Sequence, residues 1–267
     1  MPYIETDKIN LYYEIDGDGP YVTLINGLTM NTAGWVFQVS DLSKKYSVLR
    51  YDCRGQGNSD KPDEEYTQEL HAGDLHVLLK RLGISKTHII GLSNGGMIAQ
   101  HFALDYPETL GALVLVDTSS YVDTLLKLIV ESWIKANDRG GNDLRFDVSL
   151  PYIFSEDFIK NNADIIDKMI EANTNINTPY AVKRLAIASA AHDLRHRVSE
   201  INCPTLIVVG DEDILVPPRY SHILHREIPG SELVTIENSG HVPTIEKPAE
   251  FNRTVLDFLR NHDRLLS

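Results

Sequence analysis

The chain has 267 residues, of which 42% are hydrophobic and 24% are charged, and its formal net charge is −13. This length allows a large buried core, and the acidic balance excludes the basic surface with which proteins bind nucleic acids. The two cysteines, Cys53 and Cys203, lack the close spacing of zinc-binding or redox-active pairs, so we expect reduced thiols and no metal or other cofactor.

The predicted elements begin with residues 3–15, where apolar and polar side chains alternate as in a half-exposed strand. Short apolar runs then predict further strands at residues 21–25, 47–51, 88–90, 113–116, 205–209 and 232–236. Helical periodicity separates them, at residues 70–82, 97–106 and 248–259. Apolar strands that alternate with helices predict an α/β fold, with a mostly parallel sheet covered by helices on both faces.

Residues 119–199 show helical periodicity and no strand comparable to the others. We therefore predict a helical cap over these residues, inserted into a core domain formed by residues 1–118 and 200–267. Such a cap is expected over the carboxyl edge of the sheet, where open α/β sheets bind their ligands.

The chain contains no apolar run long enough to span a bilayer. Residues 1–16 are charged and lack the apolar core of a signal peptide. We therefore expect a cytoplasmic protein that does not bind membranes, and either a monomer or a homodimer.

The pattern Gly-x-Ser-x-Gly occupies residues 91–95, after a predicted strand and before a predicted helix. This context is typical of a nucleophile elbow, a sharp turn that lifts the serine hydroxyl above the edge of the sheet. Ser93 is therefore the candidate nucleophile. The backbone N–H of Asn94, at the start of the helix, is a candidate donor to an oxyanion.

A serine nucleophile needs a basic partner, usually a histidine that is oriented by a carboxylate. In folds that carry the serine on a strand-to-helix elbow, the three residues follow one another along the chain as serine, then acid, then histidine. Asp213 follows the strand at residues 205–209 and is a better placed acid than Asp211, and His241 follows the last strand. The Leu28 N–H, in the loop after the strand at residues 21–25, is the second candidate oxyanion donor, although an ordinary turn also explains that loop.

Candidate contacts to a substrate lie in the same loops and in the predicted cap. The apolar stripes of the cap suggest a small or medium, largely apolar acyl or alcohol group, while packing inside the cap is an alternative explanation for its aromatic side chains. The candidates for substrate contact are Asn26, Thr29, Tyr121, Trp133, His192 and Val242.

The motifs together resemble the α/β-hydrolase superfamily. The resemblance covers nearly the whole chain outside the predicted cap, and it implies a triad of Ser93, Asp213 and His241 with oxyanion donors from Leu28 and Asn94. One departure is clear, because the superfamily usually has His-Gly where this chain has Asn26-Gly27. The motifs are Asn26-Gly27 before Trp35, Asp52-x-Arg54-Gly55-x-Gly57-x-Ser59, Gly91-x-Ser93-x-Gly95-Gly96, Gly210-x-x-Asp213-x-x-x-Pro217 and Gly240-His241.

Within the superfamily, residues 190–195 before Cys203-Pro204-Thr205 are similar to 3-oxoadipate enol-lactonases and small-ester hydrolases. The resemblance implies a cofactor-independent carboxylic ester or lactone hydrolase that works through an acyl-enzyme on a small-molecule substrate. Two alternatives use the same triad: a perhydrolase similar to the non-haem haloperoxidases, and a hydrolase of C–C bonds. A ligand receptor that keeps the fold without turnover is a third alternative.

Overall fold

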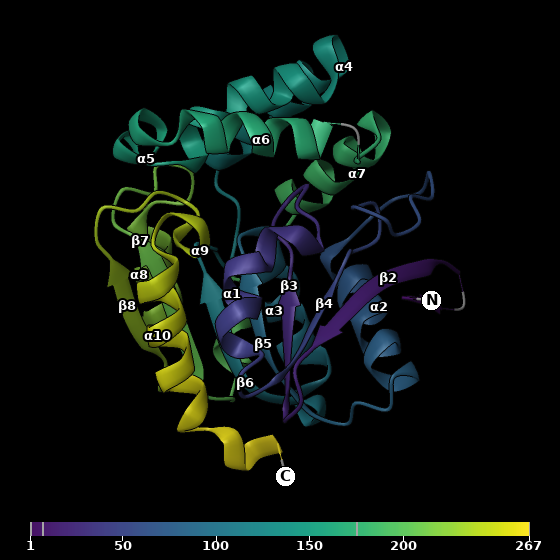
Figure 1. Ribbon diagram of the computed structural model, residues 1–267, viewed down its shortest axis with the longest axis vertical. Helices are drawn as coiled ribbons and strands as arrows, with labels where there is room; N and C mark the ends of the chain where they lie inside the picture. The colour runs from purple at the N-terminus through teal and green to yellow at the C-terminus, as the bar shows by residue number, and fades with distance from the viewer. Residues whose placement is uncertain (1, 7, 175, 267) are drawn as a thin grey trace.

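The computed structural model describes residues 2–6, 8–174 and 176–266, and for residues 170–174 the backbone alone. One sheet of eight strands runs through the middle of the molecule (Figure 1). The strands are β1 (Tyr3–Glu5), β2 (Asn10–Asp16), β3 (Tyr21–Ile25), β4 (Ser47–Tyr51), β5 (Thr87–Leu92), β6 (Leu110–Val116), β7 (Thr205–Gly210) and β8 (Glu232–Ile236). Their order is β1-β2-β4-β3-β5-β6-β7-β8, with antiparallel pairing only of β1 with β2 and of β2 with β4 among the paired strands described.

The structure confirms the mostly parallel sheet and corrects two details of the predicted strands. Residues 3–15 are two strands, because the chain turns at Thr6, whose N–H donates to Ile9 O at 2.8 Å and whose hydroxyl accepts the Ile9 N–H at 3.1 Å. The strand β8 lies at the edge of the sheet, so of its side chains only Ile236 is fully buried. The strands β5, β6 and β7 are buried along their whole length, as their continuous apolar runs predict.

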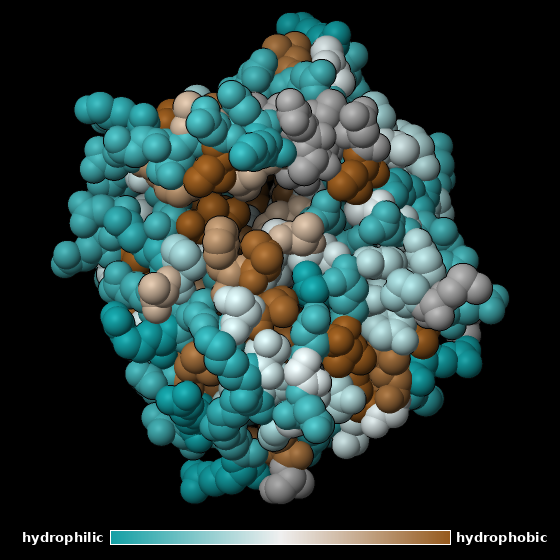
Figure 2. Space-filling model, in the orientation of Figure 1, coloured by the Kyte–Doolittle hydropathy of each residue, from teal (hydrophilic) through white to brown (hydrophobic). Residues whose placement is uncertain are grey.

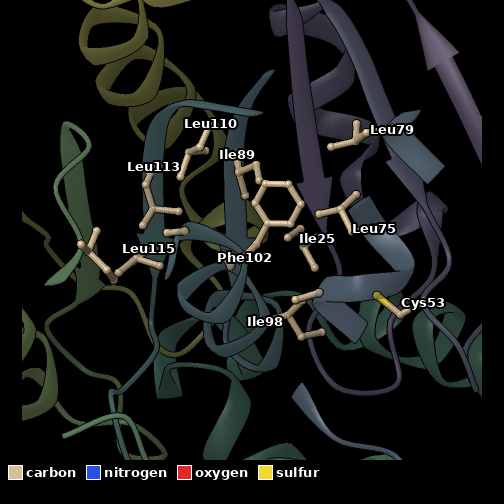
Figure 3. Close-up of a cluster of buried hydrophobic side chains, with 14 of the residues drawn as sticks. Ile25, Cys53, Leu75, Leu79, Ile89, Ile98, Phe102, Leu110, Leu113 and Leu115 are labelled. Carbon is tan, nitrogen blue, oxygen red and sulfur yellow. The ribbon is translucent and has the colours of Figure 1, made fainter. Parts of the chain in front are cut away.

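Helices cover both faces of the sheet. On one face lie α2, α3 and α8, and on the other α1 and α10, each face with its own apolar cluster. In Figure 3, Phe102 and Ile98 of α3 pack against Ile25 of β3, Ile89 of β5 and Leu75 of α2. The helices of this layer are α1 (Val36–Leu42), α2 (Gln68–Arg81), α3 (Asn94–Asp105), α8 (Pro218–Glu227), α9 (Pro243–Glu246) and α10 (Pro248–Arg260).

Four further helices follow β6 and precede β7, and we call them the cap helices: α4 (Thr124–Ile153), α5 (Glu156–Asn161), α6 (Ala163–Thr174) and α7 (Pro179–Ala190). They stand as a layer beyond one end of the sheet (Figure 1). The helix α4 is kinked at Gly141, whose φ of 68° lies in the left-handed region that glycine adopts readily. Among the helices that the structure describes, none combines the length and the apolar character needed to cross a lipid bilayer.

Candidate active site

Ser93 lies in a sharp turn between β5 and α3. Its φ of 54° and ψ of −115° are rare for a residue with a side chain, and such strain persists only where surrounding structure holds it. The Ser93 N–H donates to Val116 O at 2.8 Å, which ties the turn to the end of β6. Small neighbours make the turn possible, since a Cβ on Gly91 would lie 2.4 Å from Gly95 O. The local sequence therefore holds the hydroxyl at the carboxyl edge of the sheet.

The structure brings Ser93 together with the two partners expected from the sequence. Nε2 of His241 lies 2.8 Å from Ser93 Oγ, and Nδ1 of His241 lies 2.7 Å from Asp213 Oδ2. A carboxylate only accepts hydrogen bonds, so Nδ1 carries the ring proton and Nε2 is free to accept the proton of the serine hydroxyl. The arrangement can therefore raise the nucleophilicity of Ser93.

Both partners are buried and are themselves held in place. Asp213 Oδ1 accepts the N–H groups of Leu215 at 2.8 Å and Val216 at 2.9 Å, while its other oxygen faces the imidazole. The backbone N–H of His241 donates to Ile153 O, at the end of α4, at a distance of 2.9 Å. Because the histidine loop is bonded to a cap helix, the position of the cap and the orientation of the imidazole depend on each other.

A second link joins the same loop to the cap through Glu246. Its Oε1 accepts the Gly240 N–H at 3.1 Å, and its Oε2 accepts the hydroxyl of Ser155 at 2.5 Å. Burial raises the pKa of Glu246, while the hydrogen bonds from Ser155 and Gly240 oppose that shift. This carboxyl group therefore connects the residue before His241 to the segment that follows α4.

A carboxyl group that the sequence analysis missed, that of Asp117, lies behind the relay. Asp117 is fully buried at the end of β6, and its Oδ1 accepts the Gly210 N–H at 3.0 Å. One possible metal-ligand atom from each of Asp117, Asp213 and His241 lies within 4.8 Å of the other two. Among the described residues, this group has the spacing that could hold a metal ion. Burial, and after it the charge of Asp213, raises the pKa of Asp117 well above its usual value, which favours its protonated form. An aspartate directly after an apolar strand was the signal in the sequence.

Replacing Asp117 with asparagine is expected to stabilise the protein more at pH 8 than at pH 5. The folded state raises the pKa of Asp117, so it binds the proton more tightly than the unfolded chain, and stability is lost as pH rises above the unfolded pKa toward the folded one. Asparagine keeps the oxygen that accepts from Gly210 and cannot ionise. The melting temperature at the two pH values measures this, and a gain at pH 8 of a few degrees is expected, since about 1 kcal/mol shifts it by roughly 2–4 °C at this size.

The exposed Asp143 provides the control for this substitution. Asp143→Asn is expected to change the melting temperature by the same small amount at both pH values. An Asp117→Asn variant with an equal effect at pH 5 and pH 8, or a larger gain at pH 5, would contradict the stated protonation of the buried carboxyl group.

The two backbone donors predicted for an oxyanion lie beside Ser93. Asn94 is the first residue of α3, and Leu28 follows β3 in a loop that also lines the cavity next to the hydroxyl. The Gly27 carbonyl of this loop is bonded away from the cavity, since its oxygen accepts from Gln56 Nε2 at 2.7 Å. Within the described chain, neither the Leu28 N–H nor the Asn94 N–H donates to another group. Both groups are therefore available to a ligand.

A cavity of about 100 Å³ opens next to Ser93 and His241. Its walls come from the β3 loop, from the elbow and from the cap helices, and Figure 2 shows apolar side chains gathered around a hollow below the cap. Of the predicted substrate contacts, Thr29, Trp133 and Val242 line it. The full lining is Gly27, Leu28, Thr29, Met30, Leu92, Ser93, Trp133, Arg145, Phe146, Ile153, Phe154, Met169, Leu215, His241, Val242 and Ile245.

Three of the predicted substrate contacts lie outside the cavity lining, and the first of them is Asn26. Its side chain is fully buried beneath the loop that carries Leu28. It donates to Tyr51 O at 2.9 Å and accepts from Trp35 Nε1 at 2.8 Å. The amide is therefore occupied by internal hydrogen bonds. Asn26 supports the loop that carries Leu28 and does not line the cavity.

Tyr121 and His192 also lie outside the cavity lining. The Tyr121 ring packs edge-on against Tyr220, with a centroid distance of 5.8 Å. The His192 ring contacts Ser119 O at 3.2 Å and His101 at 3.3 Å, and burial lowers the pKa of His192 to about 3. Both side chains lie where the cap meets the core. Their positions in the sequence are equally compatible with this packing role and with a place in the cavity wall.

Arg145 is the polar lining residue that the sequence analysis missed. It lies on α4 beyond the kink at Gly141, between Leu144 and Phe146. Its side chain is buried in the cavity wall, although an arginine in a helix is more often on the surface. Arg145 and Ser149 are four residues apart and therefore lie on one face of the helix, which is buried. This spacing was the signal in the sequence for a polar lining residue.

A central parallel sheet, a strand–serine–helix elbow and a buried Asp–His–Ser relay at the carboxyl edge together define the α/β hydrolase class. The family model described as alpha/beta hydrolase fold matches residues 20–248, so the chain belongs to this family.

Similar proteins share the fold over nearly their whole length. The curated "Putative carbamate hydrolase RutD" of Escherichia coli O150:H5 (strain SE15) is 28% identical over 254 residues, which cover 94% of this chain and 96% of that protein. The structure of MGS-M2, an alpha/beta hydrolase enzyme from a Medee basin deep-sea metagenome library, has a TM-score of 0.91 and 31% identity, and 96% of each chain is covered. The enol-lactonase from Burkholderia xenovorans LB400 has a TM-score of 0.91 and 29% identity, covering 97% of this chain and 100% of that one.

Proposed function

We propose that this protein is a serine hydrolase that cleaves carboxylic ester or lactone bonds of small substrates through an acyl-enzyme. The observation that carries the proposal is the hydrogen-bonded series Ser93–His241–Asp213 at the wall of an apolar cavity. Similarity to an enol-lactonase over the whole chain supports the choice of an oxygen ester.

In the proposed reaction, Ser93 Oγ attacks the substrate carbonyl carbon while His241 Nε2 accepts its proton. The N–H groups of Leu28 and Asn94 stabilise the negative oxygen of the tetrahedral intermediate, and each such donor contributes roughly 3 kcal/mol of barrier reduction. Collapse of the intermediate expels the alcohol oxygen, which receives the proton from His241. Water then attacks the acyl-enzyme by the same route, and Asp213 holds the imidazole throughout.

The size of the cavity supports a small substrate. Its volume of about 100 Å³ is below the range of roughly 300–1,000 Å³ that is typical of pockets for drug-sized ligands. Short acyl groups and small lactones are therefore the proposed substrates. Cleavage of carbamates is the natural comparison, because the Escherichia coli relative bears that name.

The test combines covalent labelling with a substrate panel. A fluorophosphonate that phosphonylates activated serines is expected to add one label per chain, and peptide mass spectrometry is expected to place it on Ser93. The panel contains p-nitrophenyl acetate and butyrate, a small lactone and an aryl carbamate, and we expect turnover of the esters or the lactone. Labelling at another residue, or turnover of the carbamate with no hydrolysis of any ester or lactone, would refute the proposal.

A further inference from the structure

The side chain of Arg145 is a buried positive charge without a partner among the residues that the structure describes. It is 6% exposed, its Nε is buried without a hydrogen-bond partner, and no ion pair to it exists among the residues that the structure describes. The other deeply buried arginine, Arg54, differs sharply. Its guanidinium binds both carboxylate oxygens of Asp74 at 2.8 Å and also contacts Glu64.

An unpaired buried charge is costly, because the loss of hydration amounts to several kcal/mol when no opposite charge or hydrogen bond replaces it. Burial lowers the pKa of Arg145 to about 10, so the guanidinium still carries its charge at neutral pH. None of the described residues that line the cavity is an aspartate or glutamate. A ligand is therefore the remaining source of a counter-charge.

Arg145 is also placed where a ligand would meet it. It lines the same cavity as Ser93 and His241, and Phe146 and Trp133 also belong to that lining. The indole Nε1 of Trp133, which also lines the cavity, is buried and has no hydrogen-bond partner within the described chain. An apolar cavity with one cationic side chain in its lining matches a small molecule that has an anionic end.

We propose that Arg145 binds a carboxylate of the substrate, so that the preferred substrates are half-esters of short dicarboxylic acids or lactones that carry a carboxylate. The inference rests on the proposed ester or lactone hydrolysis and specifies its substrate class. A guanidinium presents parallel N–H groups that match the two oxygens of a carboxylate, which fixes the orientation of the ligand as well as its charge. The small cavity places that carboxylate only a few bonds from the carbonyl attacked by Ser93.

Because the whole chain is negatively charged, its selectivity for an anionic substrate depends on contacts inside the cavity. A formal net charge of −13 repels anions at long range, so an anionic substrate gains nothing from electrostatic steering. Selectivity for a carboxylate must then come from contact with Arg145 inside the cavity. This expectation replaces the largely apolar substrate inferred from the apolar stripes of the cap.

The kinetic test compares two esters with the same leaving group, mono-p-nitrophenyl glutarate and p-nitrophenyl butyrate. The wild-type protein is expected to have the higher kcat/KM for the glutarate, and Arg145→Met is expected to lower the ratio of glutarate to butyrate roughly 10²-fold, as for loss of one partner of a desolvated ion pair. Arg145→Lys is expected to retain part of the preference. The matched control is Arg139→Met, an exposed arginine on the same helix, which is expected to leave the ratio unchanged.

The melting temperature separates ligand binding from a structural role. Removal of an unpaired buried charge is expected to leave the melting temperature of Arg145→Met equal to that of the wild type or higher. A lower melting temperature together with an unchanged glutarate to butyrate ratio would assign Arg145 to packing and overturn the proposal. So would a wild-type protein that hydrolyses butyrate without preferring glutarate, although that result would leave ester hydrolysis intact.

A binding measurement judges the proposal even if the assumed hydrolysis fails. Calorimetric titration of Ser93→Ala with monomethyl glutarate and with dimethyl glutarate needs no turnover. The monoanion is expected to bind at least about tenfold more tightly, and Ser93→Ala combined with Arg145→Met is expected to lose that difference. Equal affinity of the two esters for Ser93→Ala would refute the carboxylate site.

Discussion

Replacement of Ser93 by alanine is expected to lower kcat for p-nitrophenyl butyrate by roughly 10⁴–10⁶-fold, as in serine hydrolases that lose their nucleophile. The His241 imidazole, 2.8 Å from the missing oxygen, would then have only water to activate. Because Ser93 and His241 both line an open cavity, water can replace the hydrogen bond that His241 Nε2 loses, and the melting temperature is expected to stay close to that of the wild type. Steady-state kinetics and a thermal melt on the same preparation measure both quantities.

A buried serine outside the relay provides the control. Ser120 is 1% exposed and its hydroxyl has no hydrogen-bond partner in the described chain, so Ser120→Ala is expected to retain activity. Since the relay acts as a unit, a double variant with alanine at Ser93 and His241 is expected to be no less active than Ser93→Ala alone. An Ser93→Ala protein that keeps a tenth of the wild-type activity would end the serine mechanism.

Replacement of Gly95 by alanine is expected to cost more than about 4 kcal/mol of stability, or to prevent folding, as overpacking against a rigid backbone does. A Cβ at this position would lie 2.2 Å from Ile25 O and 2.7 Å from Asn26 O. Both atoms belong to the main chain where β3 ends and the loop that carries Leu28 begins, so neither can move without disturbing the sheet. Urea denaturation, or the yield of soluble protein, measures the effect.

Gly73 on α2 is the matched control for this substitution. A Cβ there would meet only Tyr106 Oη, at 3.7 Å, which is an ordinary contact. Gly73→Ala is therefore expected to stabilise the protein by up to about 1 kcal/mol, since alanine is the better helix former. A Gly95→Ala protein as stable as the wild type would mean that α3 does not need its close approach to β3.

The parts of the fold that could be predicted are those in which the signal is local. The strands β5, β6 and β7 are continuous apolar runs because both of their faces are buried, and the elbow at Ser93 combines small residues with a strand and a helix. The helix α1 was not predicted, because it exposes Val36 and Phe37 and so lacks a clean apolar stripe. The turn at Thr6 was missed because the alternation of side chains continues across it.

The sequence by itself determined the order of Ser93, Asp213 and His241 at the ends of strands, and parallel strands end at one edge of a sheet. Only the tertiary structure decided which other side chains meet there. Asp117 lies behind the relay and Arg145 lines the cavity, while Asn26 turns into the core. The reason is physical: the environment of a charge or an amide depends on how the cap packs on the sheet, and those neighbours are distant along the chain.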